Sequence, residues 1–162
     1  MERLHFKTTI LSDCAILEQL NHGGLKMDIE QAQDFLSQHH RGVLATTRQN
    51  GGLQMSPILI GVNDEGQAII SSRETAYKVR NLRREPRATV CVFKDGFFGQ
   101  WLQIEGTADI LSLPQALEPL VDYYKSVVGE HPDWEEYREA MLKEKRVLIR
   151  IAIERVGPKR SG

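Results

Sequence analysis

Apolar residues recur along the chain with two different periods, and the changes of period mark where strands and helices are expected. From residue 42 to residue 111, apolar and polar positions alternate over several segments, which is typical of half-buried strands. Asn50, Gly51 and Gly52 interrupt the first alternating stretch, and an Asn-Gly pair favours a tight hairpin turn. We therefore expect strands at residues 42–48, 53–60, 67–72, 88–94, 100–111 and 147–155. The last strand should place one apolar face inward, formed by Val147, Ile149, Ile151 and Ile153.

The remaining segments favour helices. Residues 28–39 carry apolar side chains with the period of a helix. A short helix is expected between residues 72 and 86, because Pro86 has no N–H with which to continue it, and Thr75 or Ser72 can cap its start. Two further helices are expected at residues 114–128 and 132–145. Gly129 should end the first, and Pro132 suits the first helical position of the second.

This order of elements predicts a mainly β fold with peripheral helices. The six strands are joined mostly by hairpins, and strands that close on one another leave no exposed edge. A small six-stranded antiparallel barrel is therefore expected, in a single domain. Gly106 lies inside the strand at residues 100–111, which predicts a bulge or a close approach of another backbone segment.

Composition narrows the function classes. A net charge of −1 argues against a general nucleic-acid binder, which would be strongly basic. Cys14 and Cys91 give no disulfide framework, and this favours a reduced, cytoplasmic setting. No apolar run approaches the roughly 20 residues that cross a bilayer, so no membrane partner is expected.

The segment at residues 71–90 carries the strongest functional pattern. Its arginines, spaced i, i+3, i+4 and i+7, are expected to form one basic helix face, while Val79 and Leu82 point inward. These arginines are Arg80, Arg83, Arg84 and Arg87. Such a face either binds a polyanion or is simply solvated.

Lys78 lies in the first turn of that helix, where free N–H groups and the helix dipole favour an anion. Ser71 and Ser72 end the strand before it. The three residues predict a phosphate site; the alternative is a solvated lysine beside a capping serine.

Other candidate positions are less specific. Thr46, Thr47, Gln54 and Ser56 place hydroxyls and an amide on paired strands, where they either line a ligand or face water. Phe97, Phe98 and Trp101 follow a turn and could wall a flat ligand, although packing is an equal interpretation. The five histidines show no metal-ligand spacing, and Cys91 has no partner that would activate it, so it is expected in the core. We assign no catalytic residue.

Several runs together resemble one family. These are Gly42 to Thr46, the Asn-Leu-Arg-Arg-Glu-Pro-Arg run from Asn81, Glu105-Gly-Thr107, the Gly-Glu-His-Pro-Asp-Trp run from Gly129, and Arg146-Val147. Over residues 27–158 the chain resembles the pyridoxamine 5′-phosphate oxidase-like split β-barrel superfamily, and in particular its deazaflavin (coenzyme F420)-dependent branch. Residues 1–26 are then an N-terminal extension, which we expect to be dispensable for cofactor binding.

The resemblance implies an FMN-binding type of split barrel that forms a homodimer, with the cofactor at the subunit interface. Lys78 matches the lysine that contacts the cofactor phosphate, and Asn81 belongs to the same run. The chain has Ala76 and Tyr77 where flavin-binding members often have Ser-Arg, which weighs mildly against FMN. The arginine face of Arg80, Arg83, Arg84 and Arg87 would suit the acidic glutamyl tail of the deazaflavin, and Arg80 and Arg84 are assigned to the site. Residues that match Thr46, Thr47, Gln54 and Ser56 line the ring and ribityl region in relatives.

The implied activity is an oxidoreductase that uses reduced coenzyme F420 to transfer hydride to a small conjugated acceptor. Two alternatives remain open: an FMN-dependent oxidoreductase of the same fold, and a non-catalytic flavin or haem carrier. The sequence is silent on the choice between enzyme and carrier.

Overall fold

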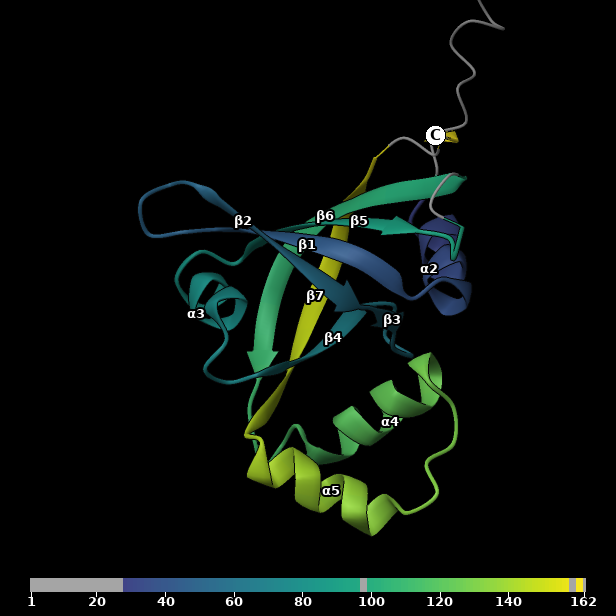
Figure 1. Ribbon diagram of the computed structural model, residues 1–162. Helices are drawn as coiled ribbons and strands as arrows, with labels where there is room; N and C mark the ends of the chain where they lie inside the picture. The colour runs from purple at the N-terminus through teal and green to yellow at the C-terminus, as the bar shows by residue number, and fades with distance from the viewer. Residues whose placement is uncertain (1–27, 97–98, 158–159, 162) are drawn as a thin grey trace, which may run out of the picture.

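The computed structural model describes residues 28–96, 99–157 and 160–161, which form a strongly curled antiparallel sheet with helices around it (Figure 1). The expected extension at residues 1–26 and the aromatic pair Phe97 and Phe98 lie outside the described residues. None of the described helices has the length and apolar character needed to cross a membrane.

The sheet has eight strands in the order β2-β1-β5-β6-β7-β4-β3, and β8 pairs with β6 off this path. Contacts between β2 and β4 bring the two ends of the sheet together, so the sheet closes on itself as a split barrel. The predicted mainly β split barrel with peripheral helices is confirmed. The strands are β1 (Arg41–Thr47), β2 (Leu53–Leu59), β3 (Gly61–Val62), β4 (Ala68–Arg73), β5 (Arg87–Phe93), β6 (Gln100–Leu111), β7 (Arg146–Val156) and β8 (Arg160–Ser161).

Four described helices surround the sheet: α2 (Ile29–Gln38), α3 (Tyr77–Arg84), α4 (Leu117–Val127) and α5 (Trp134–Lys143). Asp28 caps α2 by accepting from the Gln31 N–H at 2.8 Å. Asp133 caps α5 by accepting from two N–H groups of its first turn. Pro132 therefore precedes the cap, and its expected place at the first helical position is wrong. Residues 114–116 form a turn, so α4 begins later than the sequence predicted.

Two expectations for α3 are also corrected. Its N-cap is Ala76, and no side chain caps its start, so the capping role expected for Thr75 or Ser72 is wrong. The helix ends at Arg84, before Pro86, as expected. Arg87, however, is the first residue of β5, so it does not belong to a continuous basic helix face.

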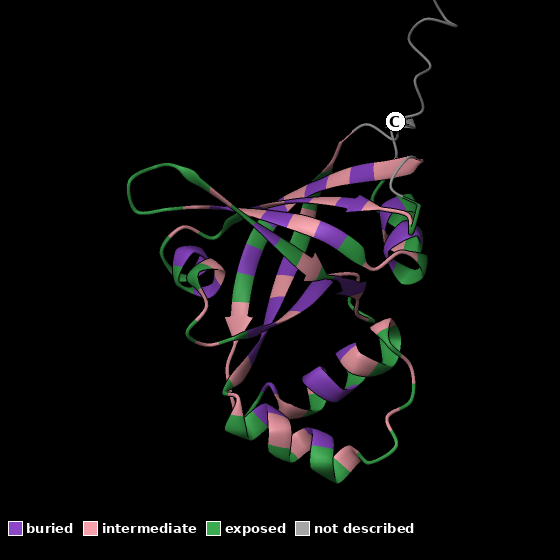
Figure 2. Cartoon of the chain, viewed as in Figure 1, coloured by how far each residue is buried: buried purple, intermediate pink, exposed green. Residues whose placement is uncertain are grey.

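Buried residues form two cores, one inside the barrel and one outside it (Figure 2). Val147 and Ile149 of β7 point into the barrel with residues of α2 and α3. Leu148 points the other way and packs with Leu120 of α4 and Tyr137 of α5. The α4–α5 pair thus covers the outer face of β4 and β7, and β7 is buried on both faces at residues 147–149 rather than on the single face expected.

Gly106 allows two strands to approach closely. The β6–β7 register shifts between Glu105 and Gly106, which is the predicted irregularity. A Cβ atom at Gly106 would clash with the carbonyl oxygen of Ala152. The close approach therefore requires glycine at this position.

Candidate functional site

A buried polar network joins α3 to the β1–β2 hairpin. Thr46 and Gln54 lie opposite each other in the hairpin register. The Asn81 Nδ2 group donates to Thr46 Oγ1 and to Gln54 Oε1, each at 3.0 Å. Val79 and Leu82 anchor the inner face of α3 in the barrel core, and this places Asn81 against the hairpin. The network uses both amide hydrogens of Asn81 and fixes the orientation of the Gln54 amide.

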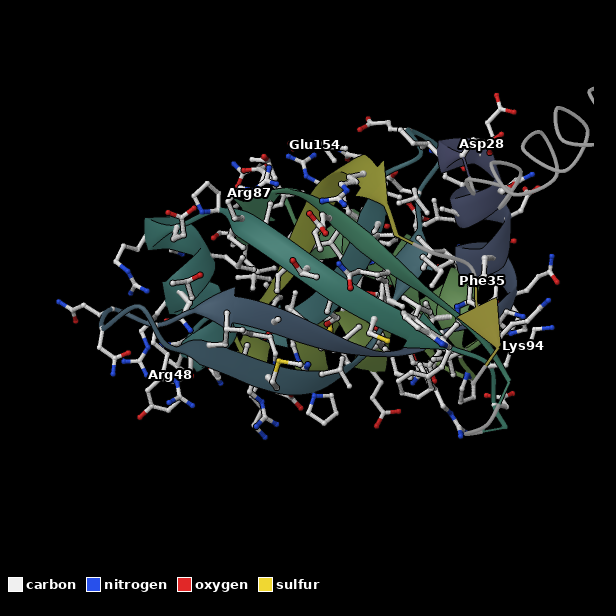
Figure 3. The ribbon with its side chains drawn as sticks, turned by 90° about the horizontal axis from the view of Figure 1, so that it is seen from above. Asp28, Phe35, Arg48, Arg87, Lys94 and Glu154 are labelled. Carbon is white, nitrogen blue, oxygen red and sulfur yellow. The ribbon has the colours of Figure 1, made fainter. Side chains whose placement is uncertain are left out.

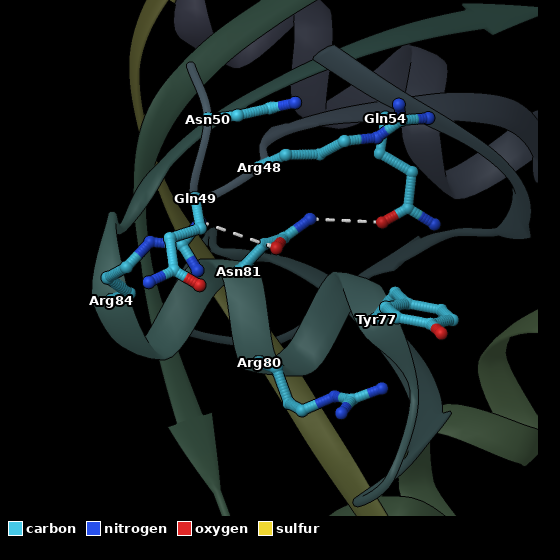
Figure 4. A pocket seen from close by; sticks show the side chains of 8 residues that line it. All are labelled: Arg48, Gln49, Asn50, Gln54, Tyr77, Arg80, Asn81 and Arg84. Atoms are coloured by element: carbon cyan, nitrogen blue, oxygen red, sulfur yellow. Dashed lines mark hydrogen bonds between the residues drawn. The ribbon is translucent and has the colours of Figure 1, made fainter. Parts of the chain in front are cut away.

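A cavity of about 580 Å³ opens over this network, between α3 and the tip of the hairpin. Figure 4 shows Asn81 of α3 pointing toward Gln54 of the hairpin, while Arg80 extends toward Tyr77. The lining residues are Arg48, Gln49, Asn50, Gln54, Tyr77, Arg80, Asn81 and Arg84.

Four of the expected site residues share this cavity: Gln54, Arg80, Asn81 and Arg84. The other four lining residues, Arg48, Gln49, Asn50 and Tyr77, were not assigned to the site from the sequence. The turn around Asn50 was predicted, but no local pattern says that the tip of a hairpin lies against a helix that begins more than twenty residues later.

Two of the three arginines of the cavity, Arg80 and Arg84, have polar or aromatic partners rather than acidic ones. Arg84 Nη2 donates to the Thr47 carbonyl oxygen at 2.5 Å and to Asn81 Oδ1 at 3.4 Å. The Arg80 guanidinium lies 4.5 Å from the centre of the Tyr77 ring. In the described part of the chain, no carboxylate forms an ion pair with Arg48, Arg80 or Arg84. The cavity therefore has an excess of positive charge.

The other two arginines of the predicted basic face are neutralised. Arg83 forms an ion pair with Glu74 at 2.7 Å and also donates to the Ser112 hydroxyl at 2.9 Å. Arg87 pairs with Glu154 across the sheet at 2.6 Å, and the two are neighbours in Figure 3. The single four-arginine face is therefore wrong; only Arg80 and Arg84 face the cavity.

Lys78 lies outside the lining of this cavity, although its neighbour Tyr77 belongs to it. The lysine is half-buried, and burial, reinforced by the positive charge of Arg146, lowers its pKa. Ser71 and Ser72 point to opposite faces of β4, because side chains alternate along a strand. Ser72 is almost fully buried and lies opposite Val147, whereas Ser71 lies opposite Leu148, on the face that α4 and α5 cover.

The remaining expected residues surround the network or lie far from it. Thr47 contributes its carbonyl oxygen to Arg84, and Ser56 is buried opposite Leu44 in the hairpin. Trp101 pairs with Phe93 near the start of β6. The helix α3 lies near the opposite end of β6, where the Ala108 N–H donates to the carbonyl oxygen of Pro86 at 2.8 Å. Trp101 does not line the cavity.

Within the described ranges, no group of three or more histidine, cysteine or acidic side chains could hold a metal ion. Cys91 is only partly buried, on the face of β5 opposite to the core residues Val90 and Val92, so its expected place in the core is wrong. Its partial burial raises the pKa of the thiol, which disfavours the reactive thiolate. The arrangement therefore offers binding and orientation rather than a nucleophile.

Known proteins share this fold. Of the solved structures, a conserved hypothetical protein of Mycobacterium tuberculosis is 25% identical with a TM-score of 0.68, over 83% of this chain and 86% of that one. An F420 reductase is 18% identical with a TM-score of 0.62, over 78% and 96%. A haem storage protein of Vibrio cholerae is 18% identical with a TM-score of 0.63, over 85% and 98%.

The family model for pyridoxamine 5′-phosphate oxidase matches residues 29–160. This range begins with the first residue of α2, ends with the first residue of β8, and includes the cavity and the polar network. The chain therefore belongs to the pyridoxamine 5′-phosphate oxidase family.

Proposed function

We propose that this chain is an oxidoreductase that uses reduced coenzyme F420 to transfer hydride to a small conjugated acceptor. The observation that carries the proposal is the cavity between α3 and the hairpin, where Arg48, Arg80 and Arg84 have no acidic partner among the described residues. The cofactor ends in a lactyl-glutamyl tail with several carboxylates, and guanidinium groups bind carboxylates well. A cavity of about 580 Å³ has room for part of such a tail.

Lys78 would anchor the phosphate of the cofactor, and the arginines would hold the tail beyond it. Tyr77 lines the arginine cavity and Lys78 follows it in the first turn of α3, so the two anionic parts of one ligand have adjacent cationic partners. Gln54, whose Oε1 is fixed by the hydrogen bond from Asn81, offers its amide N–H groups to the same ligand.

The bound deazaflavin supplies the hydride, so this chain needs no nucleophile of its own. The role of the protein is to hold cofactor and acceptor in a productive orientation and to exclude water. The raised pKa of the Cys91 thiol is compatible with that division of labour.

We further propose that the chain acts as a homodimer, with the cofactor at the subunit interface. The outer face of β2 exposes large apolar side chains: Leu53 at 64%, Met55 at 59% and Leu59 at 47%. They alternate on a strand at the edge of the sheet, which is a surface suited to a partner. A second copy would bury the same patch on both subunits around a twofold axis.

FMN is the second candidate cofactor. Lys78 lies outside the arginine cavity, so a ligand with a phosphate and no tail could still be anchored. A haem-carrying role, as the name of the Vibrio protein states for that protein, has less support here. The cavity residues that the structure describes include no histidine or cysteine to bind iron.

Three titrations test the proposal: F420 with its glutamates, F420 trimmed of them, and FMN. We expect affinity to fall in that order, and reduced F420 to be oxidised when an acceptor is present. The proposal is overturned if F420 with its glutamates, F420 trimmed of them and FMN all bind with the same affinity.

A further inference from the structure

Three side chains along one wall of the cavity form a chain of hydrogen bonds that runs in a single direction. Arg84 ends α3, Gln54 lies on β2, and Asn81 stands between them. Arg84 Nη2 donates to Asn81 Oδ1 at 3.4 Å, and Asn81 Nδ2 donates to Gln54 Oε1 at 3.0 Å. Figure 4 marks both bonds with dashed lines. The chain therefore leads from a guanidinium to an amide that borders the cavity.

The direction of this chain follows from the chemistry of its first member. An arginine side chain has only donors, so the part of the Asn81 amide that faces Arg84 is its oxygen. The nitrogen of the same amide then faces the hairpin, where it also donates to Thr46 Oγ1 at 3.0 Å. Gln54 must meet this nitrogen with its own oxygen. The Gln54 nitrogen is left on the side away from Asn81, as Figure 4 shows.

Burial keeps the chain from reversing. Asn81 and Thr46 are both buried, so a reversed Asn81 amide would set its nitrogen against a guanidinium and leave buried groups unsatisfied. Gln54 is only partly buried and lines the cavity. Its amide therefore offers N–H groups, and not its oxygen, to whatever occupies the cavity.

A second amide of the cavity has the same polarity. Asn50 Oδ1 accepts from the Gly52 N–H at 3.1 Å within the hairpin turn, so the nitrogen is the half of this amide that remains for a ligand. Arg48 and Arg80 contribute donors only. Two lining side chains can act either way: Gln49 and Tyr77. The fixed polar groups of the cavity are thus donors, which suits a ligand that presents oxygen acceptors.

We propose that Asn81 is a positioning residue that fixes the polarity of this wall, so that Gln54 selects a ligand oxygen that accepts a hydrogen bond. The inference rests on the proposed function in one respect, namely that the cofactor enters this cavity. It adds the kind of group that the ligand presents at Gln54, which is a carboxylate or carbonyl oxygen and not an N–H group. Asn81 acts on this choice through Gln54.

The substitution Asn81→Asp reverses the polarity with almost no change of shape. A carboxylate only accepts, so the Thr46 hydroxyl and the Gln54 amide both have to turn and donate to it, while Arg84 keeps its acceptor. Gln54 then presents its oxygen to the cavity. Asn50→Asp is the matched control, because it adds the same charge to the same cavity and leaves Asn81 in place.

The first measurement needs no ligand. Hydrogen exchange of the side-chain amides of the full chain is followed by NMR. In the wild type, the Asn81 amide should be protected and the Gln54 amide should exchange rapidly. In Asn81→Asp the Gln54 amide should become protected, and in Asn50→Asp it should stay unprotected. A protected Gln54 amide in the wild type overturns the inference, and so does a Gln54 amide that Asn81→Asp leaves unprotected.

The second measurement is a double-mutant cycle with Gln54→Met, which keeps the length of the side chain and removes its polar groups. F420 with its glutamates is titrated by calorimetry into the wild type, both single variants and the double variant. Gln54→Met should weaken binding about tenfold in the wild type and should cause no loss in the Asn81→Asp background. The direct effect of the added charge is common to both Asn81→Asp proteins and cancels. Equal losses in the two backgrounds overturn the inference.

A failure of the proposed function gives a different result. If F420 does not bind, or binds no better than F420 trimmed of its glutamates, the tail-binding role fails, whereas the exchange pattern of the ligand-free protein still decides the polarity of Gln54. The cycle repeated with trimmed F420 identifies the acceptor. Coupling that is lost with the glutamates assigns a carboxylate of the tail, and coupling that persists assigns a carbonyl oxygen of the ring; both support the inference.

Discussion

Asn81 of α3 donates a hydrogen bond to Thr46 of β1 at 3.0 Å, and the two residues are only 6% and 1% exposed. The same amide also donates to Gln54 at 3.0 Å. One buried side chain thus holds the helix that carries Lys78, Arg80 and Arg84 against the hairpin that carries Arg48. The geometry of the candidate site depends on this contact.

Replacement of Asn81 by alanine should therefore destabilise the protein and disorganise the cavity together. The buried Thr46 hydroxyl loses its donor, which costs about 1–3 kcal/mol for an unsatisfied buried group, while Gln54 Oε1 is only partly buried and can turn to water. Urea unfolding should show a clear loss of the free energy of unfolding, and cofactor affinity should fall under conditions in which the variant is still folded. Alanine at the exposed Gln115 is the control. An unchanged urea midpoint of unfolding for Asn81→Ala would mean that water replaces the amide without loss of stability.

The alternation of apolar residues was sufficient to predict the six long strands. In β2, however, the alternating apolar residues Leu53, Met55 and Leu59 lie on the exposed outer face and not against the barrel core. The two-residue strands β3 and β8 are too short to carry a period. The single buried face expected for β7 was wrong at Leu148. That side chain is covered by α4 and α5, and a strand pattern contains no information about which helix packs on its outer side.

The candidate site was predicted only in part, because a local sequence pattern does not show which elements the fold brings together. Arg80 and Arg84 could be identified because their helix has a clear apolar face, which fixes the direction of the other side chains, whereas Asn81 was identified through the resemblance of its run to the family. Arg48 could not, because only the tertiary fold brings the tip of the hairpin to α3. Arg87 was assigned to the helix face from its i, i+7 spacing. The helix ends at Arg84, before Pro86, so Arg87 lies beyond it.

Replacement of Met55 by aspartate should dissociate the proposed dimer. Met55 is 59% exposed on the outer face of β2, and a buried unpaired carboxylate at a twofold interface would face its own copy. Sedimentation at micromolar concentration should show the wild type as a dimer and Met55→Asp as a monomer. Leu142→Asp, at a position 48% exposed on α5, is the control and should remain dimeric. A monomeric wild type would contradict the proposal.

Phosphate anchoring by Lys78 should weaken at alkaline pH earlier than an ordinary lysine would. Burial and the charge of Arg146 lower its pKa below the usual 10.5, so the free protein loses this positive charge below that pH. The folded chain then holds fewer protons than the unfolded chain in this window. The free energy of unfolding therefore rises with pH there, while the affinity for FMN relative to riboflavin falls.

The substitution Lys78→Arg separates this titration from other alkaline effects, because arginine keeps its proton. Its ratio of FMN to riboflavin affinity should stay flat with pH. Burial raises the pKa of both Tyr123 and Tyr137, the latter to about 12, so these phenols stay neutral in the relevant window. Parallel pH profiles for the wild type and Lys78→Arg would place the titrating group elsewhere.

Arg80 and Arg84 should distinguish the two candidate cofactors. They lie one helical turn apart, about 6 Å along α3, and both line the cavity that we assign to the glutamyl tail. Exposed ion pairs are worth only about 0.2–1 kcal/mol each, so the double substitution to glutamine should cost roughly 0.4–2 kcal/mol, or about 2- to 30-fold in F420 affinity. FMN has no tail and should lose little. Calorimetric titration of both cofactors measures the difference.

Arg83→Gln is the matched control for that experiment, since Arg83 belongs to the same helix but pairs with Glu74 away from the cavity. It should leave the affinity for both cofactors unchanged. F420 trimmed of its glutamates should behave like FMN, because the charges that Arg80 and Arg84 are proposed to bind are then absent. Equal losses of F420 and FMN affinity in the double variant, or no loss of either, would mean that these arginines form only a solvated helix face and that the tail, if it binds, lies elsewhere.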